Sequence, residues 1–252
     1  MFSAVAHSES IATTTAFQKV AAVPDPHIKV LGDSIYISSM NRLIGAMACV
    51  NTNALQVRLT SPTLRRMSPY YVQPLTLALI PGASHAKDVS ISRNIVLDID
   101  EQLEAEFLGT ALAASQVSII SFLSDQEIKP VTGEIFSIRG TSTVTLAAGV
   151  FAFGTIDFDE DLPVGSYKVV GMDVVSATSV MARLVPIGAY NRPGVPCRQL
   201  VSDNDPLQTF RKGNFGEFCT FPHNNIPGIE VLCSAATGAQ TVQITLDVIK
   251  VA

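Results

Sequence analysis

Histidine is the side chain that proteins use most often for metal binding and proton transfer, and this 252-residue chain has four. They are isolated from one another in the sequence: His7, His27, His85 and His223. A metal centre on adjacent strands needs several ligands that converge, such as two closely spaced histidines and a nearby glutamate. The spacing therefore predicts neither a metal site nor a catalytic histidine.

The densest acidic group is Asp157-Phe-Asp-Glu-Asp161, in which four carboxylates fall within five residues. Carboxylate oxygens suit Ca²⁺, but the segment lacks the spacing and the glycine of an EF-hand loop. Because it precedes Leu-Pro-Val-Gly165, it is also typical of a solvated turn that discourages edge pairing. Both interpretations stay open and the turn is favoured; Asp203-Asn-Asp205 is a weaker acidic signal.

Nucleophile and phosphate-binding motifs are absent from the sequence, which has no Gly-x-Ser-x-Gly elbow, no glycine-rich phosphate loop and no Cys-x-x-Cys pair. The cysteines are unevenly divided between the halves, at Cys49, Cys197, Cys219 and Cys233. This pattern favours buried reduced thiols over a disulfide framework, with a Cys219–Cys233 bridge as the alternative. We therefore predict no catalytic residues, no cofactor and no metal, and a chain that is not an enzyme.

Composition indicates a protein that buries surface against partners. Apolar residues make up 47% of the chain and charged residues 15%, against roughly 25% charge in an ordinary soluble domain. The net charge is −5 and the 17 basic residues are scattered, which argues against direct nucleic-acid binding. There is no apolar run of 18 residues and no basic start followed by an apolar stretch, so we expect neither a membrane-spanning helix nor a secretory signal.

Two blocks of sequence recur at about half the length of the chain. Met47–Leu59 aligns with Met172–Leu184 at an offset of 125, and Glu106–Gln116 aligns with Glu230–Gln240 at an offset of 124. One inserted residue then brings two further apolar positions into line, Val117 onto Val242 and Ile119 onto Ile244. Because both blocks keep their order and nearly one offset, we predict a tandem duplication.

Arg58 and Arg183 are the most specific polar match between the two copies. An arginine at the same place on both repeated segments could pair with a carboxylate at a contact between domains or between subunits. It could equally lie on the solvent face of a strand. The sequence leaves the role of this pair open.

Alternation of apolar and polar residues with a period of two dominates the chain and predicts strands. It is clearest over Ala54–Thr60, Val180–Leu184 and Thr241–Val248. Further runs are 94–100, 116–123, 135–139, 143–158 and 167–175. Helical signals are thin, and we expect only a short helix or turn at Glu101–Glu104.

Many short strands with Pro/Gly turns predict an all-β fold of two tandem antiparallel β-sandwiches. About 125 residues per unit suits an eight-stranded jelly roll, hence a double jelly roll; a seven-stranded immunoglobulin-like sandwich is the alternative, although the chain has no Trp. We expect a polar N-terminal arm over residues 1–20, a first jelly-roll domain over 21–128 and a second over 129–252.

With this duplication and strand pattern, the chain resembles the double jelly-roll major capsid proteins of tailless icosahedral viruses, and its compact units are most similar to the corticovirus type. The resemblance covers the whole chain and rests on architecture, not on a motif. It implies a structural protein in which two jelly rolls stand side by side and three chains form a pseudo-hexagonal capsomer of the shell. Loops too short for surface towers favour shell building over receptor binding.

The resemblance also implies partners and a location. The partners are the chain itself, as a homotrimer, and neighbouring capsomers; penton or minor capsid proteins and an internal membrane are further candidates. The location is the virion, after synthesis in the host cytoplasm.

Three other classes of protein stay open. A phage tail, baseplate or decoration protein would share the composition and the assembly behaviour. A carbohydrate-binding or adhesion module is disfavoured by the absence of Trp and by only five Tyr, since such sites use exposed aromatic rings. A tandem cupin-like enzyme is disfavoured by the missing histidine cluster.

Overall fold

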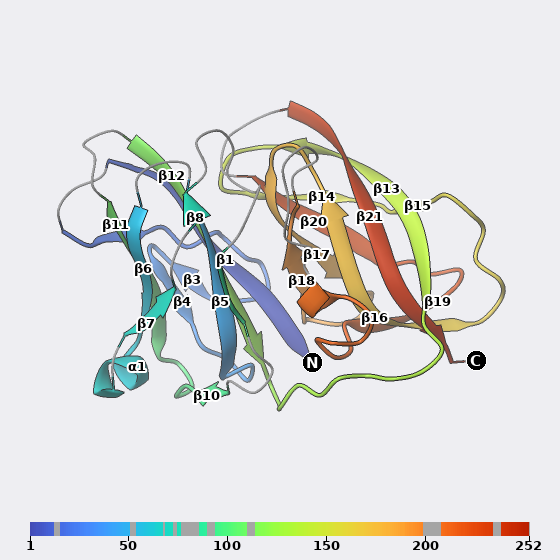
Figure 1. Cartoon of the computed structure of the whole chain (residues 1–252), viewed down its shortest axis with the longest axis horizontal. Helices are drawn as coiled ribbons and strands as arrows, with labels where there is room; N and C mark the ends of the chain where they lie inside the picture. The colour runs from blue at the N-terminus through green and yellow to red at the C-terminus, as the bar shows by residue number, and fades with distance from the viewer. Residues whose placement is uncertain are drawn as a thin grey trace.

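The computed structural model of the chain describes residues 1–12, 16–50, 54–67, 69–72, 75–76, 86–89, 94–109, 114–198, 208–233 and 238–251. Strands dominate these residues, and the fold is the predicted double jelly roll of two antiparallel β-sandwiches. The sandwiches lie one after the other along the longest axis of the molecule (Figure 1). No helix in the described ranges has the length and apolar character needed to cross a bilayer.

The first half of the chain contains twelve strands and one short helix in the described residues. In chain order they are β1 (Phe2–Ala12), β2 (Gln18–Val20), β3 (Val30–Leu31), β4 (Ser34–Tyr36), β5 (Arg42–Val50), β6 (Ala54–Thr60), α1 (Pro62–Met67), β7 (Tyr70–Val72), β8 (Leu75–Thr76), β9 (Ala86–Val89), β10 (Ile95–Val96), β11 (Gln102–Gly109) and β12 (Ala114–Ser124).

The second half, as described, contains nine strands and one 3-10 turn. They are β13 (Phe136–Leu146), β14 (Phe151–Gly154), β15 (Asp157–Phe158), β16 (Ser166–Val175), β17 (Ser179–Val185), β18 (Gly194–Pro196), η1 (Gln208–Phe210), β19 (Cys219–Pro222), β20 (Gly228–Cys233) and β21 (Gly238–Lys250).

The strands form four sheets, which we number by their order along the molecule (Figure 1). Sheet 1 has the order β3-β4-β11-β6-β7 with β2 beside β11, and sheet 2 has the order β1-β12-β5-β10 with β8 and β9 beside β5. Sheet 3 has the order β14-β20-β17-β18, and sheet 4 has the order β15-β13-β21-β16-β19. Sheets 1 and 2 make the first sandwich, and sheets 3 and 4 make the second.

The two sandwiches share one strand order. The path β1-β12-β5 of sheet 2 matches β13-β21-β16 of sheet 4, and the path β11-β6-β7 of sheet 1 matches β20-β17-β18 of sheet 3. The predicted strands at 54–60 and 241–248 are confirmed as β6 and as part of β21. Each half is thus a sandwich whose sheets correspond one to one.

Sheet 2 is buried on both of its faces. One face packs into the first sandwich through residues such as Val5, Ala48 and Ile119. The opposite face carries Phe2 and Phe122 into a cluster that is continuous with the core of the second sandwich. A strand that is apolar on both sides loses its period-two alternation, which is why β5 reads as one apolar run.

Aromatic rings fill the junction between sheet 2 and the loop that precedes β19. The ring of Phe2 lies 5.0 Å from that of Phe215 and 4.9 Å from that of Phe218. The ring of Phe122 lies 5.2 Å from that of Phe210 and 5.7 Å from that of Phe215. These edge-on and tilted contacts join the first half to the loop before β19.

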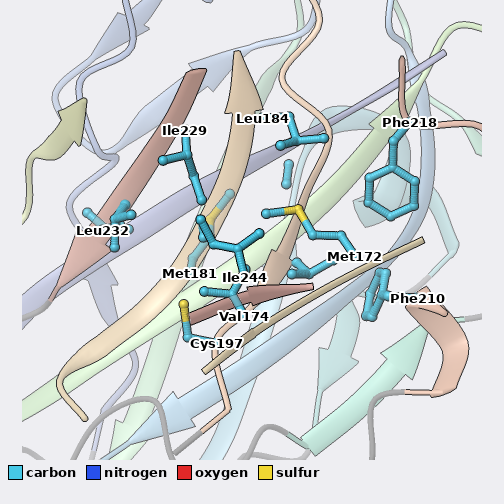
Figure 2. Packing of buried hydrophobic residues seen from close by; sticks show 14 of the residues in the cluster. Met172, Val174, Met181, Leu184, Cys197, Phe210, Phe218, Ile229, Leu232 and Ile244 are labelled. Carbon is cyan, nitrogen blue, oxygen red and sulfur yellow. The ribbon is translucent and has the colours of Figure 1, made fainter. Parts of the chain in front are cut away.

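The core of the second sandwich lies between sheets 3 and 4. Leu184 and Ile229 of sheet 3 lie close to Val174 and Ile244 of sheet 4 (Figure 2). All four side chains are almost completely buried. The alternation predicted for these strands therefore points their apolar positions inward.

The N-terminal segment differs from the sequence prediction. The polar arm expected over residues 1–20 is wrong for Phe2–Ala12, which pairs with β12 along its whole length. Its Ser and His residues made it look polar, but Phe2, Ala4 and Ala6 face the junction and Val5 and Ile11 face the first core. A weakly apolar segment is thus a strand at the edge of sheet 2 that is buried on both faces.

The helix also lies elsewhere than expected. Residues 102–109 are a strand, so the short helix or turn predicted at Glu101–Glu104 is wrong. The helix is instead α1, where Ser61 caps the N-terminus by accepting a hydrogen bond from the Leu64 amide at 3.1 Å and Pro62 occupies the first turn. The Glu101 carboxylate accepts a further bond from the Thr63 amide at 3.1 Å.

Truncating Phe122 tests the importance of the junction. Phe122→Ala is expected to lower the free energy of unfolding by about 3–5 kcal/mol, because it opens a cavity among aromatic rings. Urea denaturation followed by far-UV circular dichroism measures this loss. Phe136→Ala, at a half-exposed ring, is the control and should cost about 1 kcal/mol or less; equal effects of the two changes would contradict the assignment.

Candidate functional site

In the described part of the chain, the well-buried ion pairs lie on the outer faces of the sheets. Three groups can be distinguished. The first lies on sheet 3 at the junction, the second on the outer face of sheet 1, and the third on the outer face of sheet 4.

The junction group is centred on Arg183 of β17, whose side chain is 0% exposed. Its Nε donates to Oε2 of Glu230 at 2.6 Å, across the strand pair β17–β20. Its Nη1 donates to Oδ2 of Asp25 at 2.5 Å and to the carbonyl of Ala4 at 3.4 Å, both in the first half. The guanidinium also lies 3.6 Å from the ring centroid of Phe151.

Asp25 is held in place for this contact. Its side chain is 4% exposed, and its Oδ1 accepts the His27 amide at 2.8 Å in a turn flanked by prolines. Arg192 lies alongside and donates from Nη2 to Nε2 of His27 at 2.5 Å. Because arginine can only donate, this nitrogen of His27 is the acceptor. Burial lowers the pKa of the Arg192 guanidinium.

Sheet 1 carries the same unit at the corresponding register. Arg58 of β6 faces Glu106 of β11, with 2.5 Å between Nε and Oε2, and its guanidinium lies 3.7 Å from the ring centroid of Phe17. Phe17 lies two residues before Lys19, the partner of Glu106. Phe151 lies two residues before Phe153, the partner of Glu230. The Phe–Arg–Glu unit therefore occurs once in each sandwich.

The two units differ in what lies over them. Arg183 is covered by the first half of the chain, whereas the Arg58 side chain is 24% exposed. Next to Arg183 in the sheet is Gly194, where a Cβ would come within 2.5 Å of the arginine Cβ. The position next to Arg58 is Tyr71, a half-exposed side chain.

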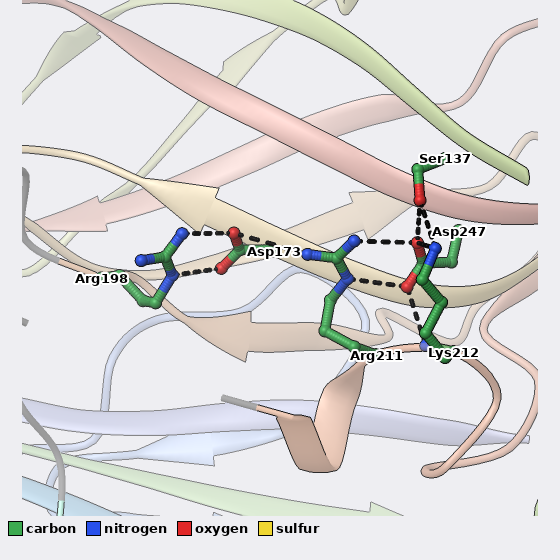
Figure 3. Close-up of polar contacts among 6 residues, drawn as sticks. All are labelled: Ser137, Asp173, Arg198, Arg211, Lys212 and Asp247. Carbon is green, nitrogen blue, oxygen red and sulfur yellow. Dashed lines mark hydrogen bonds and ion pairs between the residues drawn. The ribbon is translucent and has the colours of Figure 1, made fainter. Parts of the chain in front are cut away.

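The group on sheet 4 joins two strands to the loop that follows β18 (Figure 3). Asp173 of β16 accepts two bonds from Arg198, both at 2.6 Å. Asp247 of β21 accepts two bonds from Arg211 at 2.7 and 2.9 Å, and others from Ser137 and the Lys212 amide. The loop is thus fastened over the outer face of the sheet.

The Asp247 carboxyl shows the electrostatic balance of this group. Burial raises its pKa, but the hydrogen bonds from Arg211, Ser137 and the Lys212 amide outweigh burial, and the pKa lies well below the ordinary value. Gly171 permits the close approach, because a Cβ there would lie 2.6 Å from Oδ2 of Asp247. The carboxylate is fully engaged within its own chain.

The histidines considered in the sequence analysis lie in different parts of the described fold. His27 belongs to the junction group, and His223 lies in a loop where its Nδ1 is 3.5 Å from the Gly165 amide. His7 is 0% exposed inside the first sandwich, and burial lowers its pKa to about 4. His85 and Asp203–Asp205 lie outside the described residues.

The acidic segment Asp157–Asp161 follows β13 and β14 at the edge of sheet 4. Its carboxylates are exposed, and Asp159 pairs with Arg139 at 3.8 Å. Within the ranges that the structure describes, no three His, Cys, Asp or Glu side chains come close enough to hold a metal ion. The arrangement is that of a solvated turn.

All four cysteines are buried as reduced thiols. Cys219 lines a cavity of about 630 Å³ beside the junction, together with Phe2, Ile187 and Phe218. Burial raises the pKa of Cys219 to about 12, so its thiol stays protonated at neutral pH and is a poor nucleophile.

Sequence reasoning identified Arg58 and Arg183 but not their partners. Glu106 and Glu230 each open the second repeated block, so the signal was present in the sequence. The pairing was missed because each arginine is far from its glutamate in the sequence. Arg58 and Glu106 are 48 residues apart, and Arg183 and Glu230 are 47 residues apart. Asp25 lies outside both blocks and carried no signal.

Comparison with known proteins gives a structural likeness but no sequence match. No protein-family model matches the chain, and no curated protein matches its sequence. Among solved structures, the chain is similar to the major capsid protein P2 from bacteriophage PM2, with 10% sequence identity and a TM-score of 0.26. The match covers 99% of this chain and 98% of that one.

The two arginine units allow a matched test of how burial changes the contribution of an ion pair to stability. Arg183→Met is expected to lower the free energy of unfolding by about 3–5 kcal/mol, because buried Asp25 and Glu230 both lose the hydrogen bonds and the charge of their shared arginine. Arg58→Met should cost about 1 kcal/mol, because Arg58 is itself 24% exposed and its removal unpairs one carboxylate, that of Glu106, and not two. Urea denaturation at one protein concentration compares the two, and equal losses would contradict the burial argument.

His7 makes the stability of the chain depend on pH. The folded chain has a His7 pKa of about 4, against 6.5 ordinarily, so below pH 6.5 the unfolded chain binds a proton that the folded chain does not. Stability should therefore fall from pH 7 to pH 5, with His7 contributing about 2 kcal/mol. His7→Gln should remove that share of the fall in urea titrations, and an unchanged slope would contradict the assignment.

Proposed function

We propose that this chain is a structural protein, not an enzyme, and that it builds a shell from copies of itself. In its specific form, the proposal is a major capsid protein of a tailless icosahedral virus. Three chains form a pseudo-hexagonal capsomer, and capsomers tile the virion.

The observation that carries the proposal is the double burial of sheet 2. Two sandwiches with one strand order pack through the outer faces of their sheets, with Phe2 and Phe122 between them. Sandwiches that already associate side by side within one chain are suitable units for association between chains. Three chains supply six such units, and a closed ring leaves no growing end.

Internal duplication is part of this proposal. Strand order and the repeated Phe–Arg–Glu unit support descent of both halves from one sandwich. The division between the domains falls between Ser124, where β12 ends, and Phe136, where β13 begins. The first domain then includes β1, and no separate N-terminal arm is proposed for Phe2–Ala12.

The proposed partners are other copies of the chain and neighbouring capsomers in the virion, with penton or minor capsid proteins and an internal membrane as further candidates. Reduced, buried cysteines support synthesis in a reducing host cytoplasm. The direct sequence-specific recognition of nucleic acid is not part of the proposed role.

The native mass tests the proposed function. We expect purified chain at micromolar concentration to have three times the mass of one chain in mass photometry, and particles from its native source to contain larger assemblies. Trimerisation should be independent of added metal or cofactor. A stable monomer with no larger species in the native source would contradict the proposal.

A further inference from the structure

We infer that the outer face of sheet 1, around Arg58, is a docking surface for a second copy of this chain, which presents the outer face of its sheet 4. This inference rests on the proposed self-association and names the surfaces that carry it. The occupant follows from the way the chain covers its own Arg183.

The first step is the contact within the chain. The outer face of sheet 3 presents Arg183 and Met181, both 0% exposed, and sheet 2 lies against this face. Asp25 and the carbonyl of Ala4 contact the arginine directly. A Phe–Arg–Glu unit in this fold is therefore a surface on which a β1-β12-β5 sheet packs.

The second step transfers this contact to the other unit. Sheet 1 corresponds to sheet 3 and carries Arg58 and Glu106 in place of Arg183 and Glu230. Sheet 2 corresponds to sheet 4 by strand order. Within the chain, sheet 2 packs on sheet 3. The equivalent contact would therefore pack sheet 4 on sheet 1. These two sheets lie at opposite ends of the molecule, so the contact must join two copies (Figure 1).

The register identifies the part of sheet 4 that should face Arg58. Ala4 pairs with Phe122 in the first half, and Ser137 pairs with Asp247 in the second. Phe122 and Asp247 are 125 residues apart, which is the offset that aligns β12 with β21. Ser137 is therefore the equivalent of Ala4. Ser137 of one copy is therefore expected close to Arg58 of the next, with Lys212 beside it.

The chemistry of the two faces suits a contact between separately folded copies. Met181 of sheet 3 pairs with Leu232, and Gln56 of sheet 1 pairs with Leu108 at the equivalent position. Met181 is buried, whereas Gln56 is exposed. The face also offers Tyr71, which is 46% exposed, beside Arg58. Tyrosine and arginine are enriched at protein interfaces, and a contact formed after folding is more polar than a permanent one.

Charged groups border both faces. On sheet 1, Lys19 is 49% exposed and pairs with Glu104, and on sheet 4, Lys212 is 50% exposed and pairs with Asp247. The contact uses different faces on the two copies, so it is heterologous and closes only as a ring. This is the geometry that a trimer of double sandwiches requires.

Truncation of Tyr71 tests the docking surface. Tyr71→Ala should raise the concentration needed for half-maximal trimer formation by about tenfold or more in mass photometry. Tyr190→Ala is the matched control, because this tyrosine is 82% exposed but lies beside the junction group, away from both docking faces. Thermal melting confirms that both variants are folded. Normal trimer formation by Tyr71→Ala would overturn the inference and leave the proposed function standing.

Cross-linking of mixed isotopes locates the partner surface. Chains grown separately in ¹⁴N and ¹⁵N are dissociated, mixed and reassembled, and then treated with an amine-reactive cross-linker. We expect links between Lys19 of one label and Lys212 of the other. Heavy–light links that join Lys19 only to Lys19 would overturn the inference in favour of a two-fold contact. A wild-type chain that stays monomeric would instead overturn the proposed function itself.

Discussion

The structure depends on the burial of an arginine between two β-sheets. Arg183 leaves water completely, and this is tolerated because Glu230 of its own sheet, Asp25 of the other sandwich and the Ala4 carbonyl all accept its hydrogen bonds. The contact needs both halves, since two of the three acceptors come from the first sandwich. Around it, Phe2 and Phe122 exclude water. The charge thereby fixes how one sandwich sits on the other, and the apolar cluster supplies most of the stabilisation.

The comparison of Arg183 with Arg58 separates residue type from environment. Both arginines pair with a glutamate of the adjacent strand and lie on a phenylalanine ring. Only one is closed off by a second sheet, so the same unit is a buried junction in one half and an exposed face in the other. This asymmetry inside one chain is the basis for proposing that a sandwich of a second copy covers the Arg58 face.

Sequence periodicity predicted the half-buried strands well, because β6 and β21 place apolar residues on one face only. It failed at β1, where burial on both faces hides the alternation behind Ser and His residues. It also failed at Glu101–Glu104, where the sequence indicated a short helix or turn although residues 102–104 begin β11, which pairs with β4 and β6. Arg58 and Arg183 could be found by internal comparison, but Asp25 could not, because only the folded chain brings it to Arg183.

The most direct test of the account is a cryo-electron microscopy map of the assembled chain at side-chain resolution. The account predicts six sandwiches in a closed ring, with the face of Arg58 covered by sheet 4 of the next copy in the way that Arg183 is covered by sheet 2. A ring or shell in which the Arg58 face stays open to solvent, or meets the same face of another copy, would contradict it.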